Sequence, residues 1–168
     1  MLSNPVQKKI NEQINNELFS SYSYLAMSAY CSYKQFEGSA QWLKIQSQEE
    51  YSHAMRLYDF LVVRGCHVHL TAIEKPTNEF ESIVDVFETV LKQEQTVTAQ
   101  IDSLFELAFQ EKAFAALVEL EWFVKEQVEE EKNARDVLHK FRLLKDDPAS
   151  LLDLDRELGA RTPEEEDG

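Results

Sequence analysis

The sequence predicts an all-α protein: a four-helix bundle with one long crossover connection and a short fifth helix at its C-terminal end. Only four Gly and four Pro occur in 168 residues, which is few for a turn-rich all-β fold. Four segments of about 28 to 33 residues, or roughly 40 to 50 Å, repeat apolar residues at helical spacing. One stretch between them has no helical period. Two helical hairpins joined by such a stretch form a bundle with one crossover.

The first two segments form the first hairpin. The first helix is expected to begin at Asn4 as N-cap, with Pro5 at the first helical position. Gly38 is expected to end it, and the second helix is then expected over residues 39–65.

The second hairpin follows the crossover. The crossover is expected to be an extended connection over residues 66–79, and the two helices of the hairpin are expected at 80–108 and 113–144. A short fifth helix is expected at 149–159, and proline or acidic residues mark these boundaries. We assign residues 1–160 to one domain. The tail at 161–168 is acidic and predicted to be disordered.

Composition and charge exclude several classes of function. The net charge of −14 and the pI of about 4.7 argue against nucleic acid as a partner, and an acidic surface attracts cations. The two cysteines suggest no disulfide framework. No apolar run reaches the length of a membrane span, and the segment MLSNPVQKK lacks the apolar core of a signal peptide. We therefore expect a cytoplasmic protein.

Each of the four long helices interrupts its apolar stripe with polar residues near its middle. In the second helix Leu43, Glu50, His53 and Leu57 follow one another at helical spacing. The same indexing of the four stripes places these polar residues on inner faces: Glu17, Glu50, His53, Glu94, Gln127 and Glu130.

The spacing along the chain predicts that these residues form one layer. Glu94 and Gln127 lie 16 and 17 positions from the break at Gln110. Glu17 and His53 lie 21 and 15 positions from Gly38, which matches their heights to within about two turns.

A layer of buried carboxylates repels itself, and cations are the natural means of neutralising it. Carboxylate oxygens with one imidazole suit iron or manganese, and zinc less exclusively. Glu50 and His53 form a Glu-x-x-His motif, and glutamates from other helices complete the ligand pattern of di-iron bundles. A lone motif of this kind is a weak signal, but a metal-free structural bundle would leave the whole layer unexplained. Tyr24 lies two turns beyond Glu17, where it would pack, hydrogen-bond a ligand or donate an electron.

The segments ELFSSYSYLAMS, QSQEEYSHA, LKQEQTVT and WFVKEQVEEE resemble those of bacterial non-haem ferritins, and the likeness extends from Pro5 to Gly159. This resemblance implies a first iron site at Glu17, Glu50 and His53. It implies a second at Glu50, Glu94 and Glu130, with Gln127 close to both and Tyr24 beside the first. It also implies a third iron site at Glu49, Glu126 and Glu129, with Glu130 shared.

The resemblance further implies an iron-storage protein with ferroxidase activity: a homo-oligomeric shell of about 24 chains that oxidises Fe(II) with O2 or H2O2 and stores a ferric mineral. Haem-containing bacterioferritins carry Met where this chain has Tyr51, so we expect no haem. The alternative is a discrete di-iron oxidase or peroxidase of the rubrerythrin-like class, without storage. The amphipathic segment LLDLDREL favours the shell, because an isolated bundle has no use for it.

Overall fold

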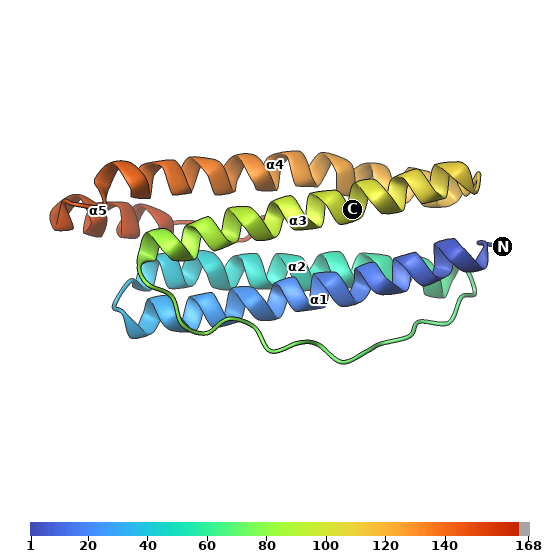
Figure 1. The fold of residues 1–168 in the computed structure, drawn as a ribbon, viewed down its shortest axis with the longest axis horizontal. Helices are drawn as coiled ribbons and strands as arrows, with labels where there is room; N and C mark the ends of the chain where they lie inside the picture. The colour runs from blue at the N-terminus through green and yellow to red at the C-terminus, as the bar shows by residue number, and fades with distance from the viewer. Residues whose placement is uncertain (165–168) are drawn as a thin grey trace.

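The computed structural model describes residues 1–164, and those residues form helices and connections without a β-strand. The helices are α1 (Asn4–Tyr33), α2 (Glu37–Val63), α3 (Ile83–Gln110), α4 (Phe114–Leu144) and α5 (Pro148–Gly159). Figure 1 shows α1 beside α2 and α3 beside α4, with the segment between α2 and α3 running along the length of the bundle. The predicted four-helix bundle with one crossover and a fifth helix is confirmed.

Two helix boundaries differ from the prediction. Ser3, not Asn4, is the N-cap of α1. The first helix ends before Gly38, and the left-handed residue of the turn is Gln35, with φ 65°. Gly38 lies inside the first turn of α2, where a Cβ atom would stand 1.7 Å from the backbone oxygen of Asp155 in α5. Glycine is needed there for the close approach of two helices, not for the turn.

The corrected first turn improves the alignment of Glu17 with His53. Glu17 and His53 each lie 18 positions from Gln35, so they stand at one height in the first hairpin. The turn between α3 and α4 has its left-handed residue at Lys112, with φ 53°, and Glu94 and Glu130 each lie 18 positions from it. These four side chains therefore lie at the same distance along the chain from the turns of their hairpins.

Most buried apolar side chains of residues 1–164 belong to two clusters, and the polar layer separates these clusters along every long helix. One cluster contains Phe87 and Phe141, whose rings stack with centroids 4.6 Å apart, and it includes residues of α5. The other contains Ile10, Leu57 and Phe123. Along the four helices, the residues that flank the layer and belong to opposite clusters are Ile14 and Tyr24, Leu43 and Ala54, Val90 and Val97, and Phe123 and Ala134.

Side chains of α1 hold the crossover in place. The backbone N–H of His69 donates to Asn11 Oδ1 at 2.6 Å, and that of Thr71 donates to Asn15 Oδ1 at 3.0 Å. The rings of His67 and His69 lie 4.1 Å apart in this connecting segment. The extended crossover has no neighbouring strand, so these asparagine side chains accept hydrogen bonds from its backbone N–H groups instead.

Helix α5 is attached to the N-terminus of α2 through a buried carboxylate. Asp155 is 7% exposed and accepts hydrogen bonds from the backbone N–H groups of Gly38 (3.0 Å) and Ser39 (2.7 Å) and from the Ser39 hydroxyl (2.7 Å). A carboxylate at a helix N-terminus satisfies free N–H groups and interacts favourably with the helix dipole. In the described part of the chain, no helix is both long enough and apolar enough to cross a membrane.

Candidate metal centre

The polar side chains predicted to face inward are buried, which confirms that part of the prediction. Their relative exposures are at most 5%: Glu17 0%, Glu50 0%, Glu94 0%, Gln127 3%, His53 4% and Glu130 5%. Each of the four long helices contributes at least one of them.

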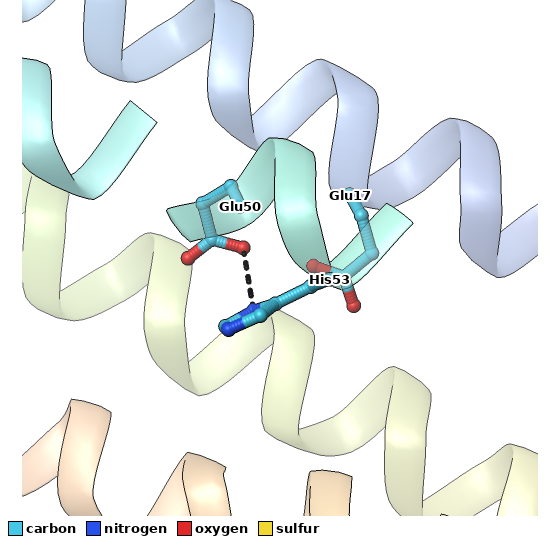
Figure 2. A group of neighbouring side chains, drawn as sticks. All are labelled: Glu17, Glu50 and His53. Carbon is cyan, nitrogen blue, oxygen red and sulfur yellow. Dashed lines mark ion pairs between the residues drawn. The ribbon is translucent and has the colours of Figure 1, made fainter. Parts of the chain in front are cut away.

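Glu17, Glu50 and His53 form the first cluster. One ligand atom from each lies within 4.8 Å of the other two. Figure 2 shows the carboxylates from α1 and α2 converging on the imidazole, with His53 Nδ1 3.5 Å from Glu50 Oε2. Both oxygens of Glu50, and Oε2 of Glu17, are buried without a hydrogen-bond partner among the described residues. Gln13 orients the other oxygen of Glu17 by donating to it at 2.8 Å.

The second cluster joins α2 to α4. Ligand atoms of His53, Glu126 and Glu130 lie within 4.8 Å of one another, so the imidazole stands between both clusters. Gln46 Nε2 donates to Glu130 Oε2 at 3.0 Å and fixes that carboxylate. The ring of Trp122 lies edge-on to His53, with centroids 5.2 Å apart.

Glu94 is held by protein donors. The Tyr24 hydroxyl donates to its Oε1. Gln127 Nε2 lies 3.3 Å from its Oε2 and 3.2 Å from its backbone oxygen, and also reaches the Thr98 hydroxyl at 3.2 Å. Tyr24 is thus a hydrogen-bonding neighbour of a candidate ligand, one of the roles that the sequence left open.

Burial dominates the electrostatics of the layer. It raises the pKa of Glu50 well above its usual value, and the charges of Glu94, Glu17 and Glu130 raise it further. Burial also raises the pKa of Glu94 to about 7 against the hydrogen bonds from Tyr24 and Gln127, and it raises the pKa of Glu130. Low dielectric and like charge both disfavour ionised carboxylates, so this layer favours protonation when no cation is bound.

The residues implied as a third iron site lie at the outer side of Glu130. Glu126 is half-buried, Glu129 is exposed, and the charges of Glu49 and Glu126 raise the pKa of Glu130. Glu49 is not open to solvent: it accepts a hydrogen bond at 2.8 Å from Arg161, which follows α5. Arg161 belongs to the tail predicted to be disordered, and residues 165–168 of that tail lie outside the described residues.

Sequence reasoning missed the side chains that orient the ligands. Gln13, Thr98 and Arg161 were not identified, and they act on residues of other turns or other helices. Gln46 stands one turn before Glu50 on the same stripe, so its inward position was visible in the sequence although its partner on α4 was not.

The donor set fits divalent cations. Buried carboxylate oxygens without a protein donor are costly, and a cation bound between them would satisfy them and remove their mutual repulsion. Carboxylates from four helices and one imidazole define the class of bundles that bind a pair of metal ions in their core. Residues 7–144 match the family model described as a ferritin-like domain. The chain belongs to the ferritin family.

Its relatives cover nearly the whole chain. The bacterial non-heme ferritin of Staphylococcus aureus (strain USA300) is 38% identical over 166 residues, which are 99% of this chain and 100% of the relative. A probable bacterial non-heme ferritin-like protein of Haemophilus influenzae is 39% identical over 159 residues, 95% of this chain and 96% of the relative.

Solved structures agree with this assignment. An open pore ferritin from the hyperthermophilic archaeon Archaeoglobus fulgidus is 42% identical, with a TM-score of 0.95 over 96% of this chain and 100% of that one. A form of the same organism's ferritin engineered to be closed is 43% identical, with a TM-score of 0.95 over 96% and 99% of the two chains.

Proposed function

We propose that this protein is an iron-storage ferroxidase that takes Fe(II) as substrate in the buried layer formed by Glu17, Glu50, His53, Glu94 and Glu130. One observation carries the proposal. Among residues 1–164, no group donates a hydrogen bond to either oxygen of Glu50, while the charges of Glu17, Glu94 and Glu130 act on that carboxylate. A central carboxylate that accepts no hydrogen bond from the described residues, with His53 Nδ1 3.5 Å from its Oε2, fits a bridge between two cations.

The other residues of the layer bind the two cations on either side of Glu50. Glu17 and His53 bind one Fe(II), with Gln13 fixing the orientation of Glu17. Glu94 and Glu130 bind the other, oriented by Tyr24 and Gln46. Gln127 stands beside Glu94 as a neutral ligand or donor. A single imidazole makes the two positions inequivalent.

Two Fe(II) ions held there would each give up one electron and become Fe(III), and the two electrons with two protons would reduce O2 to H2O2 or H2O2 to two water molecules. The protein supplies hard carboxylate oxygens, which favour Fe(III) over Fe(II). Glu50 and Glu94 hold protons because their pKa values are raised, and these protons leave as the cations bind. The apolar clusters on both sides of the layer keep bulk water out, so the cations meet fixed ligands rather than solvent.

A homo-oligomer of about 24 chains in the cytoplasm is the proposed form of the protein. Large apolar side chains are exposed at the turn between α3 and α4: Phe109 69%, Phe114 70% and Val118 74%. Further copies of the chain would cover such a surface, as neighbouring subunits of a shell do.

Size-exclusion chromatography after aerobic addition of Fe(II), with iron and protein measured in the same fractions, tests the proposal. We expect many irons per chain to elute with a particle of about 24 subunits. About two irons per chain on a small oligomer would instead establish the discrete di-iron oxidase or peroxidase. Iron that precipitates and never elutes with protein would refute both. Glu50→Ala is the matched variant, expected to lose rapid oxidation.

A further inference from the structure

The segment that follows α5 returns to the metal centre. Arg161 Nη2 donates to Glu49 Oε2 at 2.8 Å, and the two side chains are only 16% and 15% exposed. Its guanidinium also lies over the ring of Trp42, 4.7 Å from the centroid. A shielded, charge-assisted contact with an aromatic platform fixes the guanidinium far better than a solvated surface pair would.

Glu49 is a partly buried residue of the outer acidic set, which comprises Glu49, Glu126 and Glu129. Its neighbour Glu50 belongs to the buried layer, and its charge acts on Glu130 on α4. Burial raises the pKa of Glu49, and the charge of Arg161 opposes that rise. The guanidinium of Arg161 lies 2.8 Å from Glu49 Oε2, which is where a cation would compensate this carboxylate.

We propose that Arg161 is a built-in cation of the outer acidic set: it occupies Glu49 Oε2, and its charge disfavours a third iron there while the segment after α5 stays in contact with α2, although Glu49 Oε1 is buried without a hydrogen-bond partner among the described residues. The resemblance to bacterial non-haem ferritins implies an open third site, and the contact of Arg161 with Glu49 and Trp42 distinguishes this chain from that expectation. The inference rests on the proposed function, because it assumes that the inner layer binds Fe(II).

The physical argument concerns what remains when Arg161 is lost. Removing one partner of a shielded ion pair leaves an uncompensated carboxylate beside other carboxylates, which is unfavourable. Such a site recovers stability by protonation or by binding a cation. A divalent ion bound by Glu49, Glu126 and Glu130 would replace the guanidinium.

The test is anaerobic titration of the full-length protein with Fe(II), followed by calorimetry and by equilibrium dialysis. We expect about two Fe(II) per chain in the wild type. Arg161→Met keeps an apolar stem over Trp42 without the charge and is expected to bind about one Fe(II) more. Arg161→Gln repeats the test with a smaller neutral side chain, so the result does not depend on the folding of one variant.

Two further variants locate the added ion. Arg156→Met removes the same charge from α5, where Arg156 pairs only with exposed Asp153 in the described structure, and it is expected to leave the Fe(II) count at the wild-type value. Adding Glu49→Gln to Arg161→Met is expected to abolish the extra binding.

The outcomes separate the two proposals. Three outcomes would overturn the role of Arg161 but not the inner metal centre. The first is an equal Fe(II) count in the wild type and both Arg161 variants, and the second is a wild type that already binds the third ion. The third is an added ion that is still bound after Glu49→Gln. A wild type that binds no Fe(II) would overturn the proposed function and the role of Arg161 together.

Discussion

Metal binding by this chain should release protons in an amount that depends on pH between 6 and 8. Burial raises the pKa of Glu94 to about 7, and a metal ion binds the ionised carboxylate. With that pKa, Glu94 gives up about 0.9 proton on metal binding at pH 6 and about 0.1 at pH 8. The expected loss of about 0.8 proton between these two pH values is the magnitude to be measured.

Isothermal titration calorimetry with Zn(II), which is redox-inert, measures this release when it is repeated in buffers of different ionisation enthalpy. Glu94→Gln keeps an oxygen ligand but cannot titrate, so it should lose this share of the pH dependence. Glu50 and Glu130 also release protons in both proteins, and Glu94→Gln removes one of the charges that raise their pKa values, so the quantity compared is the change in release between pH 6 and pH 8. Glu88→Gln, an exposed change in the same helix, is the matched control and should behave like the wild type. The reasoning is refuted if Glu94→Gln shows the same change in proton release as the wild type.

The same pKa fixes the sign of a stability effect in the metal-free protein. Folding raises the pKa of Glu94 from 4.5 to about 7, so the protonated form is the one favoured in the folded state. Its contribution to the free energy of unfolding is fully present below pH 4.5 and is lost as the pH rises to about 7. A rise of this size corresponds to about 3 kcal/mol. Glu94→Gln should flatten this part of the pH profile, measured by chemical denaturation in the presence of a chelator.

Three further changes should have measurable effects. Glu50→Met should abolish metal binding yet raise the free energy of unfolding of the metal-free chain by about 1 to 4 kcal/mol, because it replaces a buried carboxylate without donors by an apolar side chain; an unchanged or lower denaturation midpoint in chelator would contradict this. Asp155→Ala removes three hydrogen bonds at the start of α2 and should cost about 1 to 3 kcal/mol, whereas Asp153→Ala on the exposed side of α5 should be close to neutral in the same thermal unfolding assay. Tyr24→Phe removes a donor that lowers the pKa of Glu94, so the midpoint of the proton release should move to higher pH in the calorimetric assay; a midpoint at the wild-type pH would contradict it.

The helices and the polar layer could be predicted because they follow from one periodicity. An α-helix repeats every 3.6 residues, so a glutamate in an apolar stripe must point where the apolar residues point. The position of the first turn could not be predicted from Gly38. A glycine fits a left-handed turn and a close helix contact equally well, and only the location of α5 decides between them. The residue that adopts the turn conformation is Gln35, which carries no comparable signal.

The contacts between side chains of different helices were beyond sequence reasoning. Gln13 binds Glu17 one turn away, which a helical period can suggest, but Gln46 reaches Glu130 across the bundle and Arg161 reaches Glu49 over 112 positions. Such pairs depend on the relative rotation and height of helices to within a fraction of a turn. Periodicity gives a face of a helix and does not give that precision.

The position of the polar layer explains how the bundle tolerates it. Two apolar clusters flank the layer along all four long helices, and each is complete in itself. The clusters stabilise the fold on both sides, so the carboxylates between them can be left with unsatisfied oxygens and raised pKa values when no cation is bound. A cation then binds to groups that are already held in place and gains their full attraction, since little conformational entropy is lost on binding. The same arrangement makes the layer the least favourable part of the metal-free core. Iron binding relieves the unfavourable free energy of these buried, mutually repelling carboxylates, and this relief favours binding.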